Sequence, residues 1–277
     1  MPFELITPRH HRLISDLIDK IPSGSIQEIA DLISMLIEQI RRDIPEKRRV
    51  GIGRYTITKE LGVIFYSSLE GRGIQQLHFA EKLFAVESAG PFARSLAVQL
   101  ACQHGLASRD VESAKTLLGR AAGDEDWIVR ECSSGFIRAL IKEYPDSIRA
   151  WYLEMVDSKD PNTRRFVSES LRPVAENRWF HNQPEYALEV IRHLFQESAP
   201  YPRTSVGNSL SDWMRVDADK AWPIISKLAA SGDPNSHWIA YRACRNFVKK
   251  EPRLVMETLG VSEYKYKNRR YSLADYQ

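Results

Sequence analysis

Cysteine is scarce in this sequence of 277 residues. Cys102, Cys132 and Cys244 lie far apart, form no CxxC pair and have no histidine at a metal-ligand spacing. Disulfide frameworks and structural zinc sites need such clusters. Gly51-Ile52-Gly53 lacks the flanking strand and the Gly-Lys-Ser/Thr of a nucleotide-binding loop. We therefore expect no disulfide, no metal and no cofactor.

Long apolar runs are missing as well. The longest apolar stretch, from Leu61 to Tyr66, is far too short to cross a membrane. The first residues, Met1 to Leu5, lack the basic and apolar regions of a signal peptide. The composition, with 43% hydrophobic and 27% charged residues, is that of an ordinary soluble protein. These observations predict a cytoplasmic protein without a membrane partner.

No charge sign dominates the chain. The sequence has 39 basic and 36 acidic residues, so that its formal net charge is only +3. Net charge alone therefore points to no polyanionic partner, and any electrostatic argument depends on where the charges lie.

Helical spacing of apolar residues recurs along almost the whole chain, and no alternating strand pattern persists. Ser25 to Glu28 is a capping box that opens a helix reaching about Arg42. Further helices are expected over 57–70, 74–87, 91–105 and 109–122. From residue 124 onward, Asp and Pro before helix starts mark paired helices. This pattern predicts an all-α protein, an α-α superhelix of HEAT-like repeats.

Three regions are expected from these patterns. They are an N-terminal helical region over 1–90, the HEAT-like solenoid over 91–260, and a basic, Tyr-rich tail over 261–277. The whole chain forming a single solenoid is the alternative. The tail either contacts phosphates or is a solvated extension.

A polar stripe recurs on the first helix of each pair. It consists of positions i, i+4, i+7 and i+11, which share one helical face, from starts at 127, 165, 201 and 238. One interpretation is a solvated face held by ion pairs worth ~0.3–0.5 kcal/mol each. We favour an interaction surface, because stacked repeats align equivalent faces and aromatics beside arginines suit nucleic acid. The stripe residues are Trp127, Glu131, Ser134, Arg138; Arg165, Glu169, Arg172, Glu176; Tyr201, Ser205, Asn208, Asp212; Trp238, Arg242, Arg245 and Lys249.

Two segments on this stripe resemble the DNA alkylation-repair family of HEAT-like-repeat glycosylases, the AlkC/AlkD type. Residues 164–173 are similar to its Arg-Arg-x-x-Ser-Glu-x-x-Arg-Pro run, and residues 205–212 to its Ser-Val-x-Asn-x-Leu-x-Asp run. Residues 238–260 fit its terminal repeat. The resemblance covers about residues 124–260 and does not reach 1–90.

The resemblance implies that the chain binds duplex DNA and hydrolyses the bond between an alkylated purine and deoxyribose. Alkylation makes the base cationic and a good leaving group, so a carboxylate has to stabilise the sugar cation and position water. By this resemblance Asp212 matches the catalytic-site acid, with Glu169 in support. The other implied residues are Arg165, Arg172, Arg242, Arg245 and Lys249 for DNA, and Trp127, Trp179 and Trp238 for stacking on the lesion or sugar.

The sequence departs from the family pattern at two places. Trp179 follows Pro173 at a longer spacing than the family's active-site tryptophan, and the family's upstream glutamate falls near Ser134, with Glu131 replacing it only in a shifted alignment. Three functions therefore stay open. They are a DNA glycosylase, a non-catalytic binder of damaged or branched DNA, and a HEAT-type scaffold with a protein partner.

Overall fold

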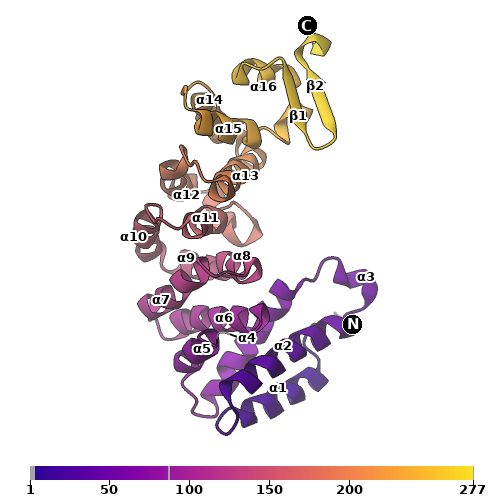
Figure 1. Cartoon of the computed structure of the whole chain (residues 1–277), viewed down its shortest axis with the longest axis vertical. Coiled ribbons are helices and arrows are strands. Elements are labelled where there is room, and N and C mark those ends of the chain that lie inside the picture. The colour runs from indigo at the N-terminus through magenta and orange to yellow at the C-terminus, as the bar shows by residue number, and fades with distance from the viewer. Residues whose placement is uncertain (1–3, 87, 277) are drawn as a thin grey trace. The chain divides into compact units, whose positions relative to one another are not determined.

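A computed structural model describes residues 4–86 and 88–276 of the chain (Figure 1). The chain divides into two compact units, Met1–Tyr144 and Pro145–Gln277. Among the described helices, none is both long enough and apolar enough to cross a membrane.

The first unit consists of helices packed around α6 (Pro91–Ala107), which is buried on most of its surface. This helix packs against α4, α5, α7 and α8. Ser25 accepts a hydrogen bond from the Glu28 amide, as expected for the residue that caps α2. The other helices are α1 (Pro8–Lys20), α2 (Ile26–Asp43), α3 (Glu46–Arg49), α4 (Arg54–Glu70), α5 (Gln76–Phe84), α7 (Val111–Ala122), α8 (Trp127–Phe136) and α9 (Arg138–Glu143).

The second unit consists of paired helices followed by a β-hairpin. The first helices of successive pairs, α11, α13 and α15, lie side by side, with α13 between the other two (Figure 1). We call these three helices the first row. The elements are α10 (Pro145–Met155), α11 (Pro161–Ser170), η1 (Ala175–His181), α12 (Pro184–Ile191), η2 (Arg192–Leu194), α13 (Pro200–Val216), α14 (Ala218–Ala229), α15 (Pro234–Ala243), η3 (Phe247–Lys249), α16 (Pro252–Leu259), β1 (Glu263–Tyr266), β2 (Arg269–Ser272) and η4 (Leu273–Tyr276).

Aspartates cap the repeated helices as their position in the sequence predicts. Asp160 accepts a hydrogen bond from the amide of Asn162 at the start of α11, and Asp233 accepts one from Ser236 at the start of α15. Asp126 and Asp217 cap α8 and α14 in the same way. Each cap satisfies a backbone donor that the first turn leaves unpaired. The paired-helix pattern predicted from residue 124 is therefore present.

The division of the chain differs from the expected boundaries at residues 90 and 260. Residue 90 directly precedes α6, which packs on both α4 and α5, so the helices before and after it share one core. The division lies instead between Tyr144 and Pro145.

The C-terminal region, expected as a tail, is folded into a hairpin, although most of its described side chains are exposed. β1 and β2 pair antiparallel, with Tyr264 opposite Tyr271. Tyr264 is fully buried, and its ring stacks on Tyr241 of α15 at 4.2 Å between centroids. The alternation of tyrosines in these strands extends over only four residues each, which is too short for a strand pattern to be recognised in the sequence.

Candidate nucleic-acid interface

Two carboxylates are buried together where α11 meets α13 in the second unit. Glu169 lies in the last turn of α11 and is 4% exposed, whereas Asp212 lies within α13 and is 2% exposed. Burying a carboxylate is costly unless it is paired and hydrogen-bonded. Arg172 satisfies both: its Nη1 donates to Glu169 Oε1 at 2.5 Å, and its Nε donates to Asp212 Oδ2 at 2.7 Å. We call Glu169 and Asp212 the acid pair.

Further donors complete the surroundings of the acid pair. Ser205 of α13 donates to Glu169 Oε2 at 2.8 Å, and Arg165 Nη2 lies 3.6 Å from the same oxygen. Arg215 Nη2 donates to Asp212 Oδ1 at 2.6 Å. Three guanidinium groups therefore face two carboxylates, so the cluster is cationic overall.

This surplus of positive charge keeps Glu169 ionised. Burial raises the pKa of Glu169, but the charges of Arg172 and Arg165 together with its hydrogen bonds outweigh burial and hold that pKa below the usual range. Burial lowers the pKa of Arg172, and the two carboxylates raise it above its ordinary value. At neutral pH Glu169 can therefore accept hydrogen bonds and supply a negative charge, but it cannot act as a proton donor.

Access to the acid pair depends on Arg215. The Asp212 side chain is 3% exposed, whereas the Arg215 side chain that pairs with its Oδ1 is 63% exposed. Exposed ion pairs contribute little, typically ~0–1 kcal/mol, so this contact can be exchanged for another partner. The other oxygen, Oδ2, is held by the half-buried Arg172.

The polar stripe joins neighbouring helices in the second unit at some of its positions. Glu169 bonds to Ser205, and Arg242 Nε donates to Asn208 Oδ1 at 3.0 Å. The Arg165 guanidinium lies 4.5 Å from the Tyr201 ring centroid. At Glu169, Ser205 and Asp212 the stripe is therefore buried between first-row helices, whereas Glu176, Tyr201 and Lys249 are exposed.

The arginines expected to hold DNA are arranged in two groups. Arg165 and Arg172 are engaged with the acid pair. Arg242 and Arg245 project from the end of the first row at α15, near Lys249 of η3, which is exposed. Burial, together with the charge of Arg242, lowers the pKa of Arg245.

The three tryptophans occupy separate environments. Trp238 of α15 is covered by the Arg203 guanidinium, 4.6 Å from its ring centroid. Trp179 lies in η1 and packs on Phe180 and Tyr186, with ring centroids 4.5 and 5.0 Å away.

Trp127 belongs to the first unit. It begins α8, is 63% exposed, and lines a pocket of about 250 Å³ together with Tyr55 and Glu131. Ser134, near which the family's upstream glutamate falls, is buried on the same helix and donates its hydroxyl to the Arg130 carbonyl. The described contacts of the three tryptophans are therefore with other residues than Glu169 and Asp212.

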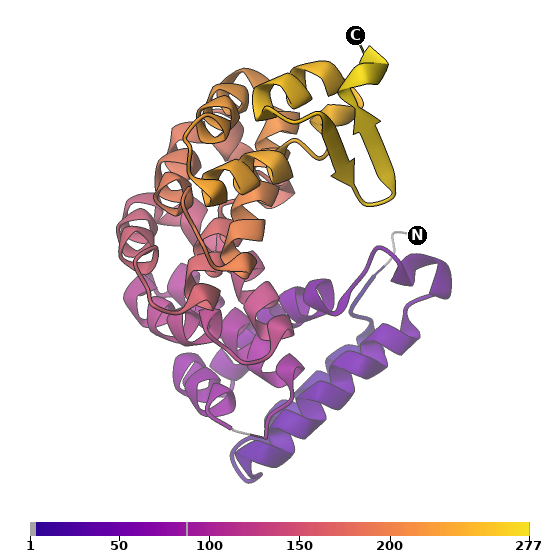
Figure 2. The same ribbon diagram turned by 45° about the horizontal axis from the view of Figure 1, so that its top comes forward.

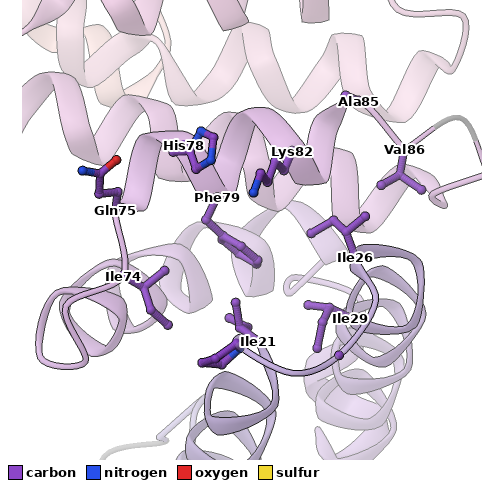
Figure 3. Close-up of a pocket in the computed structure, with 12 residues that line it drawn as sticks. Ile21, Ile26, Ile29, Ile74, Gln75, His78, Phe79, Lys82, Ala85 and Val86 are labelled. Atoms are coloured by element: carbon purple, nitrogen blue, oxygen red, sulfur yellow. The ribbon is translucent and has the colours of Figure 1, made fainter.

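Another pocket, of about 770 Å³, lies in the first unit between the α1–α2 turn and α5 (Figure 3). Phe79 points from α5 toward Ile21 and Ile29. The lining is largely apolar. His78 and Lys82 are its basic residues, and none of the lining residues is a carboxylate. It contains none of the predicted site residues and lacks the acid that base excision requires.

Metal-ligating side chains and cysteine thiols are the other groups that could carry chemistry. Within the described residues, no three His, Cys, Asp or Glu side chains converge as a metal site would require. The three cysteines are buried thiols, and burial raises the pKa of Cys132 to about 11, which makes it unreactive at neutral pH.

Sequence reasoning missed several members of the site. Arg215 stands three residues after Asp212, a helical spacing at which ion pairs form, so its role had a signal in the sequence. Arg203 and Tyr266 had none, because their contacts with Trp238 and Arg242 come from the packing of separate elements.

Two solved structures have a fold similar to that of this chain. No family model and no curated protein matches the sequence. The structure of AlkD2 from Streptococcus mutans superposes with a TM-score of 0.56 and 20% identity, covering 77% of this chain and 98% of that one. The Pseudomonas fluorescens alkylpurine DNA glycosylase AlkC, bound to DNA containing an abasic site analogue, superposes with a TM-score of 0.61 and 16% identity. That match covers 94% of this chain and 68% of AlkC.

The chain has an AlkC/AlkD-type fold. The prediction of an all-α superhelix of HEAT-like repeats is thereby confirmed.

Proposed function

We propose that this chain binds duplex DNA in alkylation repair and excises purines that N-alkylation has made cationic. The observation that carries the proposal is the buried acid pair, which Arg172 holds at fixed geometry on two first-row helices. AlkC, an alkylpurine DNA glycosylase bound to DNA, shares the fold, which supports DNA as the partner. The motifs that resemble this family's active site coincide with the acid pair.

In base excision of this kind, the main task of the protein is electrostatic stabilisation of the sugar cation. The bond between C1′ and the base nitrogen breaks, and its electron pair neutralises the cationic base as it leaves. The sugar becomes an oxocarbenium-like cation, water adds to C1′, and the proton of that water passes to solvent or to the carboxylate. A fixed anion in a site that excludes water stabilises such a cation strongly. Asp212 would supply this anion through Oδ1, whose one hydrogen-bond donor among the described residues is the exposed Arg215.

We assign different residues to positioning the acid pair and to holding DNA. Arg172 donates to both carboxylates, so we assign it to positioning Asp212 rather than to a phosphate. Glu169 acts through the same arginine. Arg242, Arg245 and Lys249 then remain for phosphate contacts, which fix the register of a duplex without reading its sequence.

A DNA binder that does not cleave is the second candidate. The observation that favours it is that both Asp212 oxygens are paired with arginines, which leaves the carboxylate 3% exposed. In that case the acid pair would stabilise the first row, and the cationic surface would carry the whole function.

A glycosylase assay on methylated duplex DNA, run beside a binding assay on undamaged duplex, separates the two candidates. We expect release of methylated purines, and a loss of at least about tenfold in the excision rate for Asp212→Asn, because a neutral amide cannot stabilise the sugar cation. Asp219→Asn, an exposed position on α14, is the matched control and should leave the rate unchanged.

Each other outcome has a definite meaning. Binding without release supports the second candidate. A loss below tenfold for Asp212→Asn contradicts the role given to that residue. Absence of binding at low salt removes both DNA functions and leaves a scaffold that takes a protein partner.

A further inference from the structure

A cleft of about 580 Å³ lies between the C-terminal end of α15 and the tip of the β-hairpin. Five of the nine residues that line it are basic and none is acidic. The chain as a whole carries a net charge of only +3, so this concentration is local. The basic residues are Arg242, Arg245, Lys249, Lys267 and Arg269.

The positive charge in this cleft has little compensation. Arg245 Nη1 is buried and has no hydrogen-bond partner among the described residues. A buried donor left without an acceptor is costly, and native proteins seldom keep one. Arg242 gives its Nε to Asn208 and packs on the Tyr266 ring, 5.4 Å from its centroid. At Arg245 the cleft therefore offers a donor that lacks an acceptor among the described residues.

The hairpin tip is held rigidly beside α15. Tyr264 Oη donates to the Tyr241 carbonyl at 2.7 Å, and the Lys265 amide donates to Tyr241 Oη at 2.7 Å. Tyr241 Oη in turn donates to the Lys265 carbonyl at 3.1 Å. A site whose groups are already in place loses little entropy when it binds, which favours affinity.

Basic residues lie on both faces of the hairpin strands and in the turn between them. Tyr266 and Arg269 are paired across the strands and line the cleft. Lys265 and Arg270 form the next pair, whose side chains point to the opposite face because strand residues alternate. Only one face of the hairpin therefore contributes to the cleft.

We propose that this cleft binds the phosphodiester backbone of a nucleic-acid strand, with the tip of the hairpin as a clamp over it. Guanidinium and ammonium groups supply charge-assisted hydrogen bonds to phosphate oxygens. Asn208, Asn246 and Asn268, which also line the cleft, supply neutral amide donors for phosphate or sugar oxygens. The proposal rests on the proposed function and adds the hairpin tip, with Lys267 and Arg269, to the phosphate contacts assigned there to Arg242, Arg245 and Lys249.

The test compares two double variants of the full chain that remove the same charge. Lys267→Ala with Arg269→Ala removes two positive charges from the cleft. Lys265→Ala with Arg270→Ala removes two positive charges from the opposite face of the hairpin. Binding of a fluorescent duplex is measured by anisotropy over a series of salt concentrations. We expect the first variant to lose about tenfold in affinity. The slope of log K against log salt concentration should also become shallower by about 2, because each lost phosphate contact changes that slope by about 0.9. The second should change by less than about twofold, since those residues lie outside the cleft.

Several results overturn the proposal. Equal losses in the two variants would show that only overall charge matters, and no loss in the first would show that the tip makes no contact. If the wild type binds no DNA, the proposed function fails with it. If the wild type binds and the tip variant binds equally well, only the clamp fails.

A free anion is the other source of the same chemistry. Inorganic phosphate is titrated into wild type and tip variant at constant ionic strength, and the melting temperature is followed. A rise that occurs only in the wild type, together with unchanged duplex binding by the tip variant, would assign the cleft to a free phosphate and overturn the clamp. Unaltered circular dichroism of both variants shows that they are folded.

Discussion

At the scale of single residues, Arg172 holds the carboxylates of Glu169 and Asp212 in position. Its Nε and Nη1 reach carboxylates on different helices, Asp212 of α13 and Glu169 of α11. A buried ion pair of this kind contributes little net stability, but losing one partner leaves an uncompensated charge that costs about 3–5 kcal/mol. The cluster is thus better understood as a device that fixes position than as a source of stability.

The protonation of Glu169 gives a prediction at this scale. Its pKa in the folded state is below the ordinary 4.5, so the unfolded chain takes up the proton first as pH falls. The stability that Glu169 contributes is therefore complete above its unfolded pKa and is lost as pH drops toward the folded value. Between about pH 5 and pH 3 we expect the melting temperature of the wild type to fall more than that of Glu169→Gln.

The exposed Glu154 of α10 supplies the matched control for this measurement. Glu154→Gln removes the same charge away from the acid pair, so its melting temperature should follow the wild type across the range. Parallel curves for wild type and Glu169→Gln would contradict the assignment.

At the scale of elements, the spacing of α13 and α15 depends on a glycine. A Cβ built on Gly207 would lie 2.6 Å from Cγ and 2.8 Å from Cβ of Arg242. The absence of a side chain lets α15 approach closely enough for Arg242 to reach Asn208. One small residue in the first row thereby sets the position of a cation at the interface.

Gly207→Ala should disturb both packing and binding. The added methyl group meets the root of the Arg242 side chain, which cannot move without its helix, so we expect a loss of about 1–3 kcal/mol in the free energy of unfolding. Affinity for duplex DNA should fall as well, because Arg242 is displaced. Chemical denaturation and anisotropy measure the two effects.

Gly71→Ala is the control for this pair of measurements. A Cβ at Gly71 would meet only ordinary contacts, at 3.6 and 3.8 Å, and substitution of a glycine in a compatible conformation is neutral or mildly stabilising. If Gly207→Ala behaves like Gly71→Ala, the close approach of α13 and α15 is not tightly constrained.

At the scale of the whole molecule, charge is balanced in total and uneven in distribution. The net charge is +3, yet the lining of the hairpin cleft contains five basic residues and no acid. On the proposed function, long-range attraction to DNA would therefore be weak, and binding would depend on local phosphate contacts, whose number sets the salt dependence.

Removing charge from two places tests this distribution. Arg242→Ala with Arg245→Ala should lower affinity for duplex at low salt by more than tenfold and reduce the salt dependence by about 2. Lys220→Ala with Lys227→Ala removes the same charge from α14 of the second unit and should leave both quantities nearly unchanged. Similar effects of the two changes would mean that net charge, and not the end of the first row, governs binding.

Local signals in the sequence were enough to predict the paired helices and part of the site, but not the C-terminal hairpin. Caps such as Asp160 and Asp233 act within a few residues of their partners, so the helix starts could be predicted. Glu169 and Asp212 were found through their resemblance to a family pattern, and their mutual approach was implied by that pattern alone.

The features that only the tertiary structure decided are contacts between residues far apart in the chain. Arg172 and Asp212 are separated by 40 positions, and Tyr264 and Tyr241 by 23. Spacing in the sequence shows which residues share a helical face, but not which face lies against a neighbouring helix or which side chains that contact buries. The sequence by itself determined the helix pairs and the polar stripe. Packing turned that stripe into a buried acid pair and folded the presumed tail into a hairpin beside α15, because both require contacts between separate elements.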